Sequence, residues 1–132
     1  RMYSASKNES ITLQILAEEV VNLTGTEFTI NYNTSFLEIT SVTQGAMFSD
    51  SGESILHAEY DNNAGILSVL TAILGGEEPS VSGTGAIIEI QMFVREYQTS
   101  TEVTFTGEEV FKDPDNNNII INEIIGGLVV IE

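Results

Sequence analysis

The sequence lacks cysteine and tryptophan, and its 132 residues include only two prolines and one histidine. Without cysteine there is no disulfide, no zinc–thiolate site and no cysteine nucleophile. A chain of this length buries roughly two-thirds of its extended surface, so its core needs no covalent or metal staple. We therefore expect a single domain over residues 1–132, with residues 1–8 as a flexible lead-in or a first strand.

Basic residues are also scarce. Against 20 acidic residues the chain has only Arg1, Lys7, Arg95 and Lys112, which gives a formal net charge of -16. Such a surface repels phosphate backbones and anionic lipid. We expect no nucleic-acid partner, and an attraction for basic partners or for calcium.

Long apolar runs are missing as well. No stretch reaches the roughly 20 apolar residues of a membrane helix, so no membrane insertion is expected. The opening "RMYSASKNES" is too polar for a signal peptide. These features predict a soluble, monomeric module of a larger chain.

What the sequence does contain is alternation with β-branched residues, the pattern of strands. In "TEFTINY", Phe28, Ile30 and Tyr32 fall on one face, and polar residues fall on the other. Turn-forming clusters such as "SDSGES", "DNNAG" and "DPDNNN" separate about nine such segments. This spacing predicts an all-β, nine-strand antiparallel β-sandwich with jelly-roll topology.

Two segments depart from simple alternation. "LAEEVVNL", residues 16–23, is the one stretch with helix-like spacing. "AGILSVLTAIL" is apolar on both faces, with Leu70 and Ala72 opposite Leu67 and Val69. A sandwich strand needs one apolar face, so the second lies under a loop or forms an exposed patch for a partner.

The sequence gives little support for catalysis. The single histidine, His57, lies in a predicted strand, and no G-x-S-x-G elbow occurs. Paired carboxylates would suffice for glycoside hydrolysis, but in so acidic a chain they discriminate nothing. We expect a protein that is not an enzyme and that needs no cofactor.

The stretch "FKDPDNNNIIINE", residues 111–123, tests for a calcium loop. Asp113, Asp115 and Asn117 fit the first three ligand positions of an EF-hand. The loop's glycine position holds Asn118 and its bidentate glutamate position holds Ile124, so the match fails. A different calcium site using Asp113 and Asp115 is the minor alternative to a polar turn.

The strand pattern resembles the cohesin domains of scaffoldin proteins. The residues that carry the resemblance are "LTGTEFTINYNTSFLEITSVTQGAMF", "GILSVLTA" with "GTGAIIEIQMFVRE", and the ending "VTFTGEEVFKDPDNNNIIINEIIGGLVVIE". The likeness spans roughly residues 9 to 132. Its motifs mainly record packing and turns.

The resemblance implies a module that binds a calcium-loaded dockerin, at the cell surface or outside the cell, to assemble multi-protein complexes. It places the contact on one sheet face, formed by the family's third, fifth, sixth and eighth strands. The positions implied here are Gly25, Glu27, Thr29, Tyr60, Ser68, Leu70 and Ala72, with a rim at Asp115, Asn116, Asn117 and Asn118.

Some positions depart from the family. Glu27 and Gly25 stand where Asp and Asn are common, and Ile73 and Leu74 replace acidic residues. Two alternatives therefore stay open: a carbohydrate-binding module, or a structural or adhesive β-sandwich of a surface protein.

Overall fold

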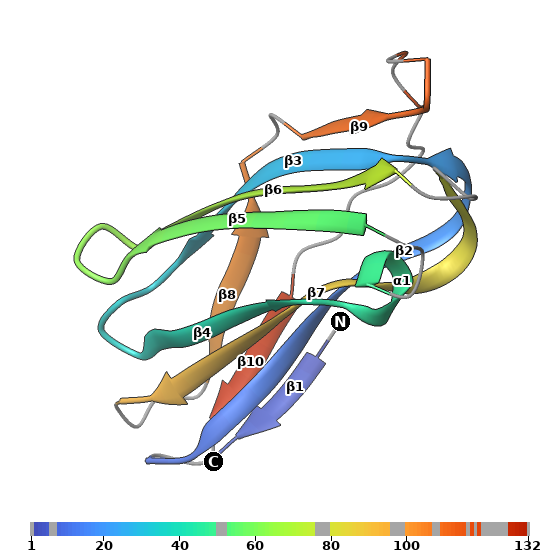
Figure 1. Cartoon of the computed structure of the whole chain (residues 1–132). Helices are drawn as coiled ribbons and strands as arrows, with labels where there is room; N and C mark the ends of the chain where they lie inside the picture. The colour runs from blue at the N-terminus through green and yellow to red at the C-terminus, as the bar shows by residue number, and fades with distance from the viewer. Residues whose placement is uncertain are drawn as a thin grey trace.

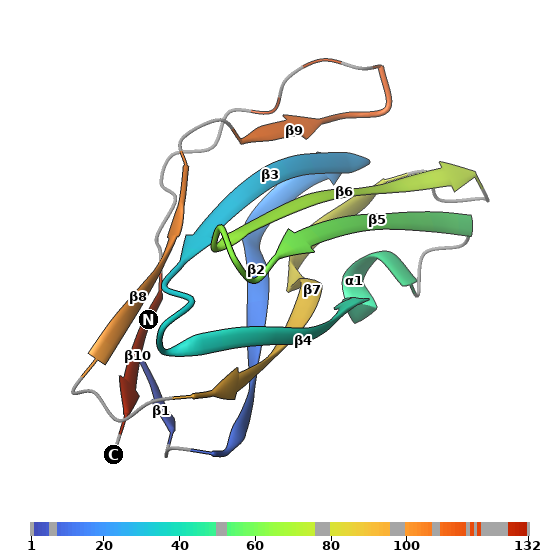
Figure 2. The same ribbon diagram turned by 90° about the vertical axis from the view of Figure 1, so that its left-hand side faces the viewer.

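Two β-sheets pack face to face in this computed structural model (Figures 1 and 2), which describes residues 2–5, 8–49, 53–75, 80–95, 100–106, 109–115, 117, 119 and 127–131. Its elements are β1 (Met2–Ala5), β2 (Ser10–Leu23), β3 (Gly25–Tyr32), β4 (Leu37–Gln44), α1 (Ala46–Ser49), β5 (Glu53–Asp61), β6 (Ile66–Gly75), β7 (Val81–Val94), β8 (Ser100–Phe105), β9 (Val110–Lys112) and β10 (Gly127–Ile131).

The larger sheet has the order β1-β10-β8-β3-β6-β5, with β9 also paired to β3, and the smaller sheet has the order β2-β7-β4. The predicted all-β jelly-roll sandwich is confirmed. Two details differ from the prediction: short β9 brings the described strands to ten, and β1 runs parallel to β10. Within the described ranges, no helix combines the length and apolar character needed to cross a membrane.

Alternation in β3 has the predicted outcome. Phe28, Ile30 and Tyr32 are buried between the sheets, and Glu27 and Asn31 are exposed. The ring of Phe28 meets that of Phe105 edge to face, with centroids 5.7 Å apart. Such a pair adds about 0.5–1.5 kcal/mol to the area that it buries.

The helix-like stretch belongs to strand β2. Ala17, Val20 and Leu23 are buried at a spacing of three residues rather than two. Their partners on β7 are two residues apart: Gly85, Gly83 and Val81. Each interval therefore contains one extra residue on β2, which is a β-bulge.

Both bulges are stabilised by hydroxyl groups of β7. Glu19 and Asn22 adopt positive φ angles of 53° and 55°. The N–H of Glu19 donates to Thr84 Oγ1, and that of Asn22 donates to Ser82 Oγ, each at 3.0 Å. These bonds replace ladder bonds that the bulges interrupt, and the result is a strand whose apolar spacing imitates a helix.

Two side-chain amides connect the sheets along the β4 edge. Asn62, in the β5–β6 turn, accepts from Tyr32 Oη at 2.6 Å and from the N–H of Ile39 at 2.9 Å, and it donates to the Ile39 carbonyl at 3.0 Å. Burial, together with the nearby Asp61, raises the pKa of Tyr32 to about 12. Tyr32 thus remains a neutral donor to Asn62 at ordinary pH.

Gln44 makes the second connection, at the other end of β4. Its amide nitrogen donates to the carbonyl of Ile55 at 3.1 Å and to Thr71 Oγ1 at 3.0 Å, and its oxygen accepts from Ser54 at 2.8 Å. Beyond it, the fully buried Phe48 of α1 closes this end of the core. Asn62 and Gln44 therefore fix the spacing of the two sheets.

Candidate partner-binding face

Strands β3, β6 and β5 lie side by side, and strand register decides which side chains share their solvent side. Leu70 of β6 pairs with Glu27 of β3 and with His57 of β5. Directly opposed residues of antiparallel strands point to the same side of a sheet. We call the set with this parity the outer face: Gly25, Glu27, Thr29, Asn31, Ile55, His57, Glu59, Asp61, Ile66, Ser68, Leu70 and Ala72.

Apolar side chains form the middle of the outer face. Ile55, Ile66 and Leu70 are 38%, 41% and 40% exposed, and Leu74, farther along β6, is 62% exposed. No described loop covers them, so the second apolar side of β6 is an exposed patch rather than a buried one. An exposed apolar patch within a polar rim is typical of a protein interface.

Carboxylates surround these apolar residues. Glu27, Glu59 and Asp61 are exposed on the outer face, and Lys112 of β9 pairs beside Gly25 at its margin. His57 lies 3.2 Å from the Glu59 carboxylate. The outer face therefore offers an apolar centre with an acidic rim.

Six of the predicted contact residues come together on the outer face. They come from β3 and β6, whose register joins the two sets: Gly25, Glu27, Thr29, Ser68, Leu70 and Ala72. Gly25 has a local reason to be small, since an added Cβ would lie 3.3 Å from that of Ala72. Thr29 and Ser68 approach each other with their hydroxyl oxygens 3.5 Å apart.

Tyr60 does not join this group. It pairs with the fully buried Leu67, so its ring points to the other side of β5, toward the smaller sheet. Its hydroxyl lies 3.5 Å from the carbonyl oxygen of Thr40, and the side chain is 42% exposed at the sandwich edge. The residues of β5 that point outward are those of the other parity, chiefly His57 and Glu59. Neither was predicted from the sequence as a contact residue.

The predicted rim lies in the loop after β9. Asp113 organises this loop, because its carboxylate accepts from the N–H groups of Asp115 at 2.9 Å and Asn117 at 2.8 Å. The pairing of β9 with β3 brings the loop to the Gly25 margin of the outer face. Asn116 and Asn118 lie outside the described residues.

Asp113 and Asp115, the two aspartates suggested for calcium, both lie in this loop. One Asp113 oxygen is committed to the two backbone amides. In the part of the chain that the structure describes, no three His, Cys, Asp or Glu side chains gather as a metal site. The contacts of Asp113 are those of a side chain that caps a polar turn.

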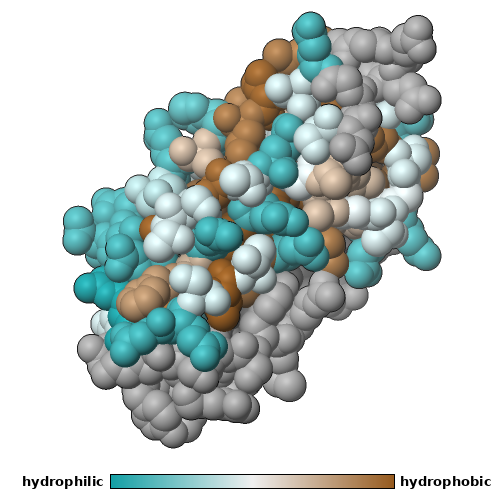
Figure 3. Space-filling model, turned by 60° about the horizontal axis from the view of Figure 1, so that its bottom comes forward, coloured by the Kyte–Doolittle hydropathy of each residue, from teal (hydrophilic) through white to brown (hydrophobic). Residues whose placement is uncertain are grey.

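The outer surface of the smaller sheet is different in character. Thr12, Gln91 and Ser41 form one row across β2, β7 and β4, and Gln91 accepts from Ser41 at 3.3 Å. In the next row Gln14 donates to Glu89 at 3.1 Å. Figure 3, which views the molecule from below relative to Figure 1, shows hydrophilic and intermediate residues over much of this side, with apolar residues in narrower strips.

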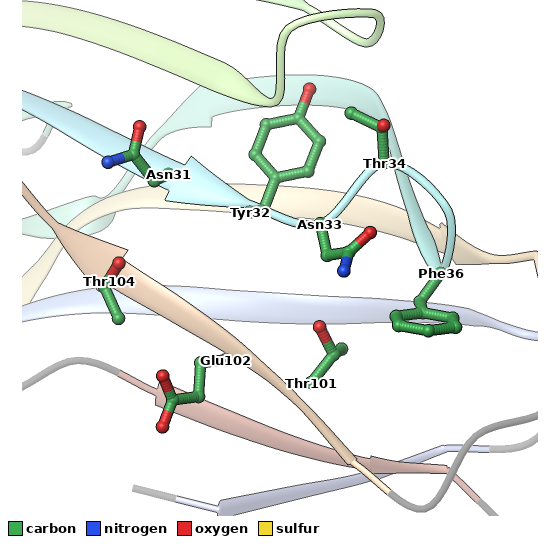
Figure 4. A pocket seen from close by; sticks show the side chains of 8 residues that line it. All are labelled: Asn31, Tyr32, Asn33, Thr34, Phe36, Thr101, Glu102 and Thr104. Carbon is green, nitrogen blue, oxygen red and sulfur yellow. The ribbon is translucent and has the colours of Figure 1, made fainter.

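A shallow depression of about 750 Å³ lies where the β3–β4 turn faces the start of β8 (Figure 4). Asn33 and Thr101 point toward the gap between turn and strand, and the Glu102 carboxylate lies at its margin. The residues that line it are mostly polar: Asn31, Tyr32, Asn33, Thr34, Phe36, Thr101, Glu102 and Thr104.

Comparison with solved structures identifies the same fold elsewhere. A non-cellulosomal cohesin from Archaeoglobus fulgidus shares 19% identity and a TM-score of 0.82, with 98% of this chain and 86% of that chain covered. The sixth cohesin of scaffoldin B from Acetivibrio cellulolyticus, solved in complex with a mutant Cel5 dockerin, shares 17% identity and a TM-score of 0.86, covering 99% and 94%.

A third similar structure is a type I cohesin–dockerin complex from Clostridium thermocellum, with 18% identity, a TM-score of 0.82, and 98% and 94% coverage. No curated protein sequence matches the chain. The family model described as "Cohesin domain" matches residues 3–125, nearly the whole sequence. Together with the sandwich already described, this match establishes that the chain belongs to the cohesin domain family.

Proposed function

We propose that this chain is a non-catalytic interaction module that binds a dockerin module of another protein through the outer face. Residues 1–132 act as one cohesin-like domain in this proposal. The observation that carries it is the exposed apolar line of Ile66, Leu70 and Leu74 on β6, which has no cover among the described residues. Its acidic surroundings favour a partner with basic flanks.

The dimensions of the outer face suit a helix. Neighbouring strands are about 4.8 Å apart, and every second residue advances about 6.8 Å along a strand, so four rows on the three strands β3, β6 and β5 cover about 10 Å by 20 Å. An α-helix is about 10–12 Å wide and rises 1.5 Å per residue. One helix of about fourteen residues therefore occupies the face along β6.

The proposal includes an extracellular or cell-surface location and no cofactor on this chain, with calcium held by the dockerin. One observation supports the dockerin partner: two of the solved cohesins described above were determined in complexes with dockerins. Predicted contacts at Tyr60, Asp115 and Asn117 become secondary, since they lie at or beyond the edges of the outer face.

The carbohydrate-binding alternative has less support. Among the side chains that the structure describes, Tyr60, at 42% exposure, is the one Phe or Tyr ring that is largely open to solvent. A sugar platform usually needs several exposed rings. A purely structural or adhesive role requires no partner, so it is the outcome that a binding test must separate from dockerin recognition.

Calorimetry with recombinant dockerins encoded in the same genome tests the proposal. We expect at least one to bind in calcium and to lose binding in chelator, because the calcium belongs to the partner. Leu70→Asp should abolish the signal, whereas Thr43→Asp on the smaller sheet should retain it. Absence of binding to every dockerin would leave the structural role as the better account.

A further inference from the structure

The depression beside β8 continues the outer face. Asn31 pairs with Thr104, and Tyr32 pairs with Val103. Asn31 and Thr104 therefore share the outer side of the sheet, and Glu102, two residues before Thr104 on β8, lies on that same side. All of the outward positions here carry oxygen atoms, so the apolar centre at Ile66 gives way to a polar end.

The depression is lined by hydrogen-bond acceptors and carries one negative charge. Glu102 is exposed, and within the described residues it has no ion-pair partner. One described cation touches the lining: Arg95 reaches the carbonyl of Thr34 at 3.4 Å, and it lies 3.9 Å from Glu38 on the smaller sheet. The Glu102 carboxylate is therefore the charged group of the depression that no described cation pairs.

We propose that this depression is the seat of an arginine or lysine side chain carried by the docked partner. The proposal rests on the proposed function for the identity of the partner, and on the lining residues for the chemistry. The Glu102 carboxylate forms the ion pair, and the amide oxygen of Asn31 and the Thr104 hydroxyl accept the remaining N–H groups. The half-buried ring of Phe36 offers an apolar wall for the aliphatic stem.

Other occupants fit less well. An anionic group would meet Glu102 and a chain of net charge -16. A sugar ring would lack a stacking surface, because Phe36 is packed partly against the core. A cation from a helix on the outer face needs only to extend past the Ile66 row, which adjoins Asn31 directly.

The first experiment tests the depression without any partner protein. Backbone amide NMR spectra of the whole chain are titrated with Nα-acetyl-arginine amide, and separately with its neutral isostere, Nα-acetyl-citrulline amide, at low salt. We expect arginine to shift the resonances of Asn31, Asn33, Glu102 and Thr104, and citrulline to leave them in place. Equal shifts with both compounds, or none with arginine, would overturn the proposal.

Two variants separate the local site from the general charge of the protein. Glu102→Gln should remove the arginine-induced shifts, and Glu18→Gln, which deletes an exposed carboxylate of β2 on the other sheet, should preserve them. Equal losses in both variants would mean that arginine responds only to net charge, which also overturns the proposal.

The second experiment uses a dockerin that binds the wild-type chain. Glu102→Gln should weaken its affinity about three- to five-fold, the usual range for a partly exposed ion pair, and reduce the dependence on salt. An unchanged affinity with an unchanged salt dependence refutes the cation seat while the proposed function stands. If no dockerin binds but arginine still shifts the depression, the proposed function fails and the cation seat stands.

Discussion

The outer surfaces of the two sheets meet water in opposite ways. On the smaller sheet, polar side chains bond across strands, as Gln14 does with Glu89 and Ser41 does with Gln91. On the larger sheet, Leu70 and Ile66 stand exposed between carboxylates. The smaller sheet pairs several of its polar side chains with one another, whereas the larger sheet leaves a row of apolar side chains on β6 that a partner can bury. A surface that has already paired its own polar groups gains less from a second protein than one that has not.

The strongest way to break this contrast is to place a charge at the centre of the outer face. Leu70→Asp puts a carboxylate beside Glu27, where a docked helix would have to desolvate it. We expect a loss of dockerin affinity on the order of 100-fold, as for truncation of a central anchor. Calorimetry measures it, with Thr43→Asp on the smaller sheet as the matched charge. A similar loss in both variants would erase the distinction between the two surfaces.

The next largest effect is expected from Asn62, whose hydrogen bonds connect the two sheets, and it concerns the stability of the fold rather than binding. Asn62→Ala removes the nearer of the two acceptors of Tyr32 Oη, and the partner of both backbone groups of Ile39. Unpaired buried polar groups cost about 1–3 kcal/mol, so the free energy of unfolding should fall by about that amount. Urea denaturation checks it. Asn63→Ala, one residue along the same turn, is the control and should change little; equal destabilisation would mean that the turn itself, not the Asn62 contacts, matters.

A smaller effect is expected on the polar surface. Gln91→Ala removes the acceptor of Ser41 Oγ, but water can replace that bond at an exposed site. We expect less than about 1 kcal/mol of destabilisation, because the net value of an exposed hydrogen bond is small, and unchanged dockerin affinity. A loss of binding would show that this surface also carries a partner.

The smallest effect at neutral pH concerns Tyr32. Its folded pKa of about 12 lies above the usual value near 10, so the folded state holds the proton more tightly. The stabilisation is present in full below pH of about 10 and is lost as pH rises toward 12. A phenolate absorbance titration should show one late tyrosine that disappears in Tyr32→Phe. A titration without a late group would contradict the enclosure of this hydroxyl.

Alternation was enough to predict most strands, because a half-buried strand must separate apolar from polar side chains. Phe28, Ile30 and Tyr32 are the plain case. It was not enough for β2, where two bulges shift Ala17, Val20 and Leu23 to a spacing of three. Positive φ at Glu19 and Asn22 depends on hydroxyl partners some 60 residues away along the chain, and no local pattern announces them.

The sequence alone indicates which residues of one strand share a side. It does not indicate how neighbouring strands pair, and therefore not which of those sides meet on one face. Leu70 and Ala72 could be assigned to one face of β6 from the sequence alone. The side of β5 that Tyr60 occupies follows from its pairing with Leu67. The depression at Glu102 joins segments about 70 residues apart, so it exists only after β3 and β8 have paired.

The parallel pairing of β1 with β10 has a mechanical consequence. Met2 lies beside Leu128 and Ala5 beside Ile131, so tension applied at the two chain ends slides one strand along the other. All hydrogen bonds of the pair then carry the load together and in shear, whereas an antiparallel terminal pair would open one bond at a time. This pair of strands thereby resists a force that slides β1 along β10.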